Sequence, residues 1–171
     1  KEMGTMEQIL VSPIRPLEII IGKVLPYILI AFLEALTILV LGMLMFKVPF
    51  MGSVSLLLLL SLLYIISALS LGLMISTLVS TQQVAMMFAM VATLLPTIML
   101  SGFIFPLNSM PVILQYVSYL FPAKYFLVVI RGIMLKGNTA GQLVFQILFL
   151  LIMSMLLLSV ALRKFRLNLE K

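Results

Sequence analysis

Four long apolar stretches dominate the sequence, and a few polar or helix-breaking residues separate each one from the next. They cover residues 24–46, 54–78, 84–105 and 142–162. A helix of about 20 apolar residues crosses the hydrocarbon core of a bilayer, which is about 30 Å thick. Lipid offers no hydrogen bonds to the backbone, so such stretches favour helices. The pattern predicts an all-α integral membrane protein with four transmembrane helices.

The connection between the third and fourth stretches, residues 106–138, predicts a different structure. It holds two apolar segments, 110–121 and 123–136, that are too short to cross and are separated by Pro122. A proline separates helices because its ring clashes with the preceding turn. We therefore expect two short helices that form a re-entrant hairpin.

Polar side chains indicate that this hairpin is external. Asn108 opens it, and Lys124 and Arg131 make its second helix amphipathic. Charged groups at membrane depth are costly, so we expect the hairpin to dip only part-way into the outer leaflet. The alternative is one long span broken at Pro122, which places Lys124 and Arg131 within the membrane.

Local signals define the end of the hairpin and the start of the last span. Gly137 and Asn138 both tolerate the left-handed conformation that ends helices. Thr139 and Gln142 then match a capping box, which predicts a helix start there.

Residues 1–23 are more polar than the rest and predict a cytoplasmic segment ahead of the bundle at 24–171. Thr5 and Gln8 match a capping box, and Ser12-Pro13 ends that helix after about two turns. A second segment restarts at Pro16. The pattern favours a short amphipathic helix that a soluble partner binds and displaces. The alternative is a solvated segment between spans.

The chain has a net charge of +6, and its basic residues lie at the ends of the spans rather than in a stripe. Clustering on one face is typical of nucleic-acid binding, so no nucleic acid is expected. Positive charge is enriched on the cytoplasmic side of membrane proteins. More basic residues lie near the two ends of the chain than in the connections on the other side, so both ends are assigned to the cytoplasm. The first set is Lys1, Arg15, Lys23, Arg163, Lys164, Arg166 and Lys171, and the second is Lys47, Lys124, Arg131 and Lys136.

The sequence contains no Cys, His or Asp. It therefore lacks the residues for thiolate chemistry, for most metal sites and for a Ser-His-Asp triad, so catalytic residues and a metal site are not expected. Gly22-Lys23 is the only Gly-Lys pair, and it lacks the surrounding pattern of a phosphate loop. The chain is not expected to be an enzyme or to bind a cofactor, and its energy must come from another polypeptide or an ion gradient.

Glu34 is the one acid deep inside a predicted span. Ionisable groups at that depth usually face a bundle interior or an aqueous cavity, which makes Glu34 a candidate for the substrate pathway. It would then bind a cationic substrate or relay a proton. The alternative is structural: a protonated carboxyl group hydrogen-bonded to a hydroxyl group such as that of Ser61 or Ser67.

Two features of the spans bear on packing. Ala68, Gly72 and Ser76 recur at helical spacing on the second, and small residues let membrane helices approach closely. Pro96 lies in the third span and predicts a kink or a local gap in its backbone hydrogen bonds.

The N-terminal run matches a known pattern. Residues 2–15, EMGTMEQILVSPIR, resemble the segment E-x-G-T-x-E-Q-L-L-V-[ST]-P of bacterial ATP-binding-cassette permeases of the type-2 exporter class. Further matches follow in order over essentially the whole chain. They are Ser76-Thr77-Leu78 with Thr81-Gln82-Gln83, residues 100–106 with Asn108-Ser109-Met110-Pro111, and Tyr125-Phe126 with Arg131-Gly132-Ile133 and Leu135-Lys136-Gly137. The chain is most similar to multidrug-type export permeases.

The resemblance implies a function. In that class the segment is a coupling helix that engages a separate ATPase, which binds ATP and magnesium. It assigns ATPase coupling to Glu2, Gly4, Thr5, Met6, Glu7, Gln8, Ile9 and Leu10. It also implies six spans per subunit and a homo- or heterodimer of permease subunits in the bacterial inner membrane, so this chain is expected to be a C-terminal part.

The expected function is therefore export of an amphiphilic or drug-like substrate, driven by ATP hydrolysis in the partner. Two alternatives stay open. One is an ion-coupled secondary transporter with Glu34 as its proton site, and the other is a membrane scaffold that transports nothing.

Overall fold

A computed structural model describes residues 16–79 and 81–169. Within these residues the chain is helical and contains no strand, as predicted. The elements in chain order are α2 (Pro16–Met45), α3 (Val54–Leu78), α4 (Gln82–Ala89), a π-helical turn (Met90–Leu94), α5 (Leu95–Leu100), a 3₁₀ turn (Leu107–Ser109), α6 (Val112–Ser118), α7 (Pro122–Lys136), a 3₁₀ turn (Ala140–Gln142) and α8 (Val144–Leu169).

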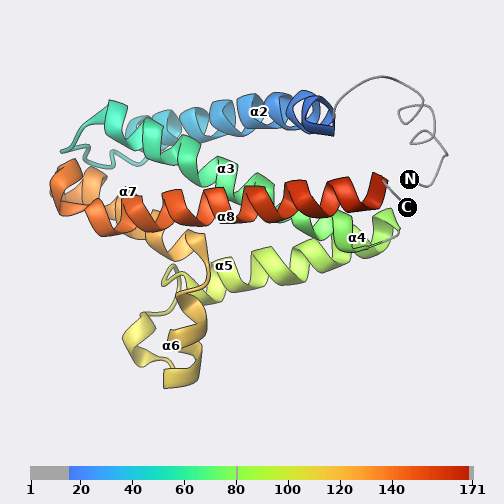
Figure 1. The fold of residues 1–171 in the computed structure, drawn as a ribbon. Coiled ribbons are helices and arrows are strands. Elements are labelled where there is room, and N and C mark those ends of the chain that lie inside the picture. The colour runs from blue at the N-terminus through green and yellow to red at the C-terminus, as the bar shows by residue number, and fades with distance from the viewer. Residues whose placement is uncertain (1–15, 80, 170–171) are drawn as a thin grey trace.

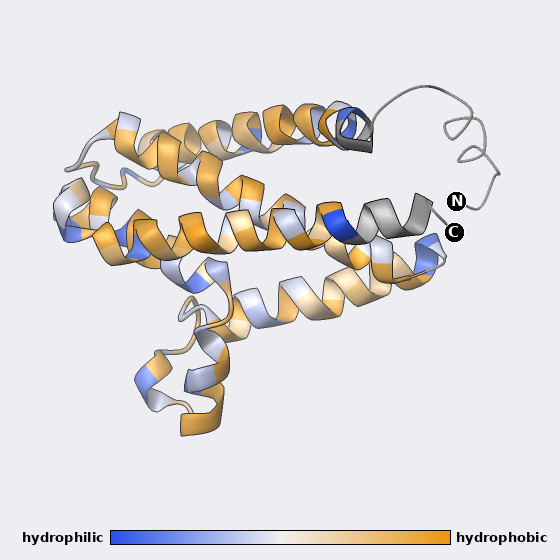
Figure 2. Ribbon diagram, in the orientation of Figure 1, coloured by the Kyte–Doolittle hydropathy of each residue, from blue (hydrophilic) through white to orange (hydrophobic). Residues whose placement is uncertain are grey.

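Four helices in the described part of the chain are long and apolar enough to cross a membrane, which confirms the predicted number. They are Ile21–Met45, Val54–Leu78, Gln82–Leu100 and Val144–Arg163, the third being α4, the π turn and α5 together. Figure 2 shows hydrophobic residues along α2, α3 and α8, with polar residues gathered toward the helix ends.

Two predicted boundaries need correction. The third span ends at Leu100 and not at residue 105, because Gly102 adopts a positive φ of 84° that stops the helix. The last helix begins at Val144, since Thr139 and Gln142 form the predicted capping box around a 3₁₀ turn instead of the first α-helical turn. The backbone N–H of Thr139 donates to Oε1 of Gln142 at 3.2 Å.

The spans lie side by side with alternating direction (Figure 1). α2 begins and α8 ends at one end of the bundle, where α3 is also followed by α4. The α2–α3 loop and the α7–α8 connection lie at the opposite end, while α6 projects away from the bundle. α3 is central: it contacts α2, α7 and α8.

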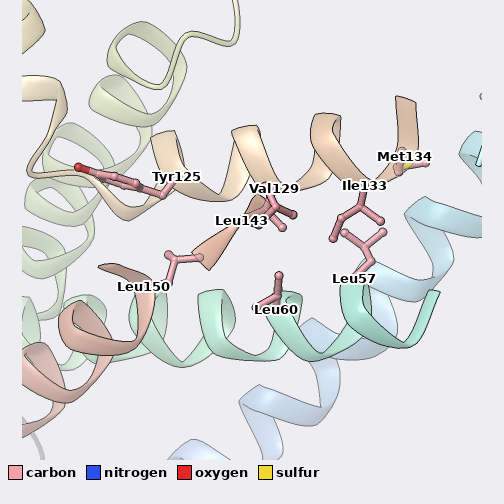
Figure 3. Packing of buried hydrophobic residues seen from close by; sticks show 8 residues of the cluster. All are labelled: Leu57, Leu60, Tyr125, Val129, Ile133, Met134, Leu143 and Leu150. Carbon is pink, nitrogen blue, oxygen red and sulfur yellow. The ribbon is translucent and has the colours of Figure 1, made fainter. Parts of the chain in front are cut away.

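The core lies between α3, α7 and α8 (Figure 3). Its buried members are Leu57, Leu60, Tyr125, Val129, Ile133, Met134, Leu143 and Leu150. Aromatic rings extend it: Tyr125 stacks on Phe149 with centroids 3.6 Å apart, and Tyr64 stacks on Phe126 at 4.3 Å. In lipid, such close packing drives helix association, because burial of apolar surface offers little there. α7 is thereby fixed against two of the spans.

The α2–α3 loop is held closely against α7. The N–H of Met51 donates to the carbonyl oxygen of Met134 at 3.0 Å. A Cβ added at Gly52 would lie 2.6 Å from the carbonyl oxygen of Ile133, so only glycine permits this approach. At the end of α7, Gly137 has a φ of 66° and caps the helix as predicted.

α3 has two distinct faces. Ser61, Ser67 and Ser70 are buried, and each hydroxyl donates to a carbonyl oxygen one turn earlier in its own helix. Ala68, Gly72 and Ser76 are exposed, and no heavy atom lies within 4 Å of a Cβ built at Gly72. The predicted close-packing face is therefore not covered by any of the residues that the structure describes.

The predicted irregularity near Pro96 is present as the π-helical turn Met90–Leu94. Pro96 has no N–H group, and its ring crowds the carbonyl four residues earlier, which belongs to Ala92. A π turn widens the helix at that point and is a common site of bending. The Thr93 hydroxyl donates to the carbonyl oxygen of Ala89 at 2.6 Å and satisfies one group of this region.

Candidate functional site

The predicted coupling residues are Glu2, Gly4, Thr5, Met6, Glu7, Gln8, Ile9 and Leu10, and all of them lie outside the described residues. The segment that follows them is α2, which runs from Pro16 through the first span without a break and contains Pro26.

Glu34 lies near the middle of the first span, on a face of α2 that other helices leave open. Its neighbours one turn away, Ile30 and Ile38, are also exposed, as is Leu41 further along. The hydroxyl groups of Ser61 and Ser67 donate within α3 instead. The structure does not bring Glu34 together with either serine, so the proposed structural hydrogen bond is not formed.

The hairpin residues are organised around α6 and α7, whose axes are bent by 81° at their junction. The helices begin and end within a few residues of the predicted limits, with Pro122 at the start of α7. Together they are long and apolar enough for a broken span or for a re-entrant loop. Asn108 is exposed in the 3₁₀ turn before α6.

Lys124 fastens the two hairpin helices together. Its Nζ donates to Oγ of Ser118 at 2.9 Å and lies 3.4 Å from the ring centroid of Tyr119. Ser118 is fully buried, and its own hydroxyl donates to the carbonyl oxygen of Gln115. Partial burial lowers the pKa of Lys124. The ammonium group of Lys124 thus makes its contacts within the hairpin, at the bend between α6 and α7.

Arg131 connects α7 to the end of the third span. Its Nη1 donates to the carbonyl oxygen of Gly102 at 3.3 Å, and its Nη2 donates to that of Phe103 at 3.4 Å. These carbonyls belong to the turn that follows α5, beyond the end of that helix at Leu100. The planar guanidinium group can contact both at once.

An apolar groove lies between α5 and α6, with a volume of about 460 Å³. Small-molecule sites typically measure about 300–1,000 Å³. The lining residues are Leu95, Pro96, Met99, Leu100, Phe105, Ser109, Met110, Pro111 and Leu114. Its size and lining suit the apolar part of an amphiphilic molecule.

The sequence singled out Arg131 and the turn after α5 separately but did not pair them. Arg131 is 29 residues from Gly102 and 28 residues from Phe103 along the chain, so their contact depends on how α7 packs. The groove was missed as well, because its walls come from two helices. Within the described residues no group of three or more acidic, His or Cys side chains is placed to hold a metal ion.

Known proteins resemble this chain over most of its length. It is 39% identical over 150 residues to the probable multidrug ABC transporter permease YbhS of Escherichia coli, covering 88% of this chain and 40% of that protein. It is 38% identical over 136 residues to the probable multidrug ABC transporter permease YbhR, covering 80% and 37%. ABC transporter G family member 20 of Dictyostelium discoideum is 25% identical over 165 residues, covering 96% and 22%. No solved structure shows a significant match.

The chain therefore spans about 40% of the length of the bacterial relatives it matches. The ABC-2 type transporter family matches residues 1–135, a range that includes the predicted coupling segment, the first three spans and nearly all of the hairpin. The chain therefore belongs to the ABC-2 type transporter family.

Proposed function

We propose that this chain is the transmembrane part of an ATP-driven exporter, and that a separate ATPase with bound ATP and magnesium supplies the energy. The observation that carries this proposal is the family match over residues 1–135, which begins at the EMGTMEQILVSP segment. The chain itself has no phosphate loop. Its role is to convert movement of the partner into movement of the spans.

Force enters, in this proposal, through residues 5–10. These residues precede α2, and α2 is one helix of 30 residues. A displacement at its cytoplasmic end would pass along this continuous helix, in which Pro26 removes one backbone hydrogen bond. α2 contacts α3 and α8, which carry the displacement into the core.

The bundle as described is incomplete as a membrane structure, which supports a partner in the membrane. No residue of the first or the third span is buried. α3 leaves Gly72 and its small neighbours exposed, and such faces are typical helix contacts in lipid. A second permease subunit, identical or related, is the proposed partner, together with further spans of the kind that the longer relatives have room for.

The proposed substrate is amphiphilic or drug-like. The α5–α6 groove offers an apolar surface at the end of the third span, and Glu34 offers a carboxyl group on the open face of the first. An apolar body with a cationic group would use both kinds of contact. The names of the bacterial relatives, probable multidrug permeases, support the same class of substrate.

A multi-pass protein of this family is proposed to lie in the bacterial inner membrane with both ends cytoplasmic. The helices support this arrangement because α2 begins and α8 ends at the same end of the bundle (Figure 1). The hairpin then lies outside.

Replacing Glu34 with Gln separates this function from ion-coupled transport. A Gln side chain still donates and accepts hydrogen bonds but cannot titrate. In proteoliposomes containing the ATPase, Glu34→Gln is expected to keep ATP-driven transport within about tenfold of the native rate, which corresponds to less than about 1.4 kcal/mol. A cationic substrate is expected to lose more than a neutral one. Complete loss of transport in a properly assembled variant would favour Glu34 as a proton site.

A further inference from the structure

The groove between α5 and α6 has both of its walls fastened to α7. α6 is fastened at the bend, where Nζ of Lys124 donates to Oγ of Ser118 at 2.9 Å. α5 is fastened through the carbonyl oxygens of Gly102 and Phe103, which accept from Arg131 at 3.3 and 3.4 Å. α7 itself is anchored in the core, where Val129 and Ile133 are fully buried (Figure 3).

The third span is held less firmly than the second and fourth spans, and in this it resembles the first. It has no buried residue, whereas a third of the second span is buried. Its backbone is irregular at Met90–Leu94, just before Pro96. A helix that has no fully buried side chain and carries a π turn can bend there at low cost. The contacts made at the α5 end of the third span therefore affect where α5 lies.

We propose that Arg131 is a positioning residue for transport: it holds α5 against α7 and so sets the width of the α5–α6 groove. The π turn Met90–Leu94 is the hinge about which α5 moves when the two hydrogen bonds break. This inference deepens the proposed function, because the groove is its candidate substrate surface. The positioning itself is tested without transport.

The geometry explains why an arginine stands here. Two carbonyls of consecutive residues are contacted by two nitrogens of one planar group, an arrangement that the single ammonium of lysine cannot reproduce. Gly102 turns its carbonyl toward α7 with a φ of 84°, which a residue with a Cβ adopts only with strain. Both donor–acceptor distances, 3.3 and 3.4 Å, exceed the usual range of about 2.7–3.2 Å, so these hydrogen bonds are weak and can break.

The test measures distances between spin labels by pulsed electron resonance on the assembled protein in lipid nanodiscs. The sequence has no cysteine, so labels can be placed on cysteines at Leu59 in α3 and Ile104 beyond α5, both of which are exposed. A reference pair joins Leu59 to exposed Leu151 in α8. Arg131→Met is expected to shift and broaden the Leu59–Ile104 distribution and to leave the reference pair unchanged. Arg131→Lys is expected to restore it in part.

Matched variants make the result specific. Lys124→Met removes the other hairpin cation, which bonds Ser118 and not α5, so it is expected to leave the Leu59–Ile104 distances unchanged. Gly102→Ala displaces an acceptor of these hydrogen bonds while Arg131 stays, and it is expected to reproduce the effect of Arg131→Met. If Arg131→Met also changes the reference distances, Gly102→Ala is the variant that tests the positioning role. Pro96→Ala added to Arg131→Met is expected to narrow the distribution again, because the hinge is stiffened.

An unchanged Leu59–Ile104 distribution in both Arg131→Met and Gly102→Ala would overturn the proposal, whatever happens to transport. Changed distances with unchanged transport would support the positioning role and contradict the part given to the groove in export. An unaltered, broad distribution after Pro96→Ala would contradict the hinge.

Discussion

Reversing the charge of Glu7 is expected to abolish ATP-driven transport while the protein still inserts in the membrane. Glu7 lies in the middle of the proposed docking residues. Glu7→Lys would place a positive charge against a group of the ATPase that is expected to be positive. At a desolvated contact this repulsion costs about 2–5 kcal/mol, which is a loss of roughly 30-fold or more in affinity for the ATPase. None of the spans is touched by the change, so folding of the bundle is expected to be preserved.

Transport by Glu7→Lys and recovery of the ATPase with the purified protein are the two readouts. Lys136→Glu is the matched control: it makes a charge reversal of the same size at an exposed position in the last turn of α7. Its transport is expected to be close to native. If Glu7→Lys transports normally and still recovers the ATPase, the coupling role assigned to residues 5–10 is wrong.

A cysteine at Asn108 is expected to react with a membrane-impermeant thiol reagent added to intact cells. Asn108 is exposed in the turn before α6, and the native sequence has no cysteine that would give a background. A cysteine at Gln83, exposed in the first turn of α4 at the other end of the bundle, is expected to react only after the cells are permeabilised. The contrast is all or none, because the reagent does not cross the bilayer.

This labelling also separates the two interpretations of the hairpin. A re-entrant loop returns to the side that it left, so Thr139 after α7 is expected to label from outside together with Asn108. A broken span would carry α6 and α7 across and place these two positions on opposite sides. Labelling of Asn108 from the cytoplasmic side alone would overturn the proposed orientation.

The four spans could be predicted because lipid imposes one strong requirement, a long apolar helix, that composition alone reveals. Turn signals were nearly as informative: Gly137 ends α7 in the left-handed conformation, and Thr139 with Gln142 forms the capping box. The end of the third span was predicted too late. The stretch stays apolar through Phe105, and hydrophobicity does not report that Gly102 has already left the helix.

Contacts between distant residues were beyond the sequence. Arg131 belongs to a run of residues that matches the family pattern, yet only the packing of α7 brings it to Gly102 and Phe103. One of the two interpretations of Glu34 placed it near Ser61 or Ser67, but serines in membrane helices readily bond their own backbone, and these do. The face that carries Glu34 is left for a partner or a pathway.

The most direct test of the central claim is transport by the native protein, co-reconstituted with its ATPase in liposomes, with the proton gradient collapsed by an ionophore. The amphiphilic substrate is a fluorescent cation whose accumulation is followed in time. The proposed function predicts transport that requires hydrolysable ATP, continues at the native rate without a gradient, and stops when the ATPase is omitted. Transport that follows an imposed pH gradient in the absence of ATP would contradict it.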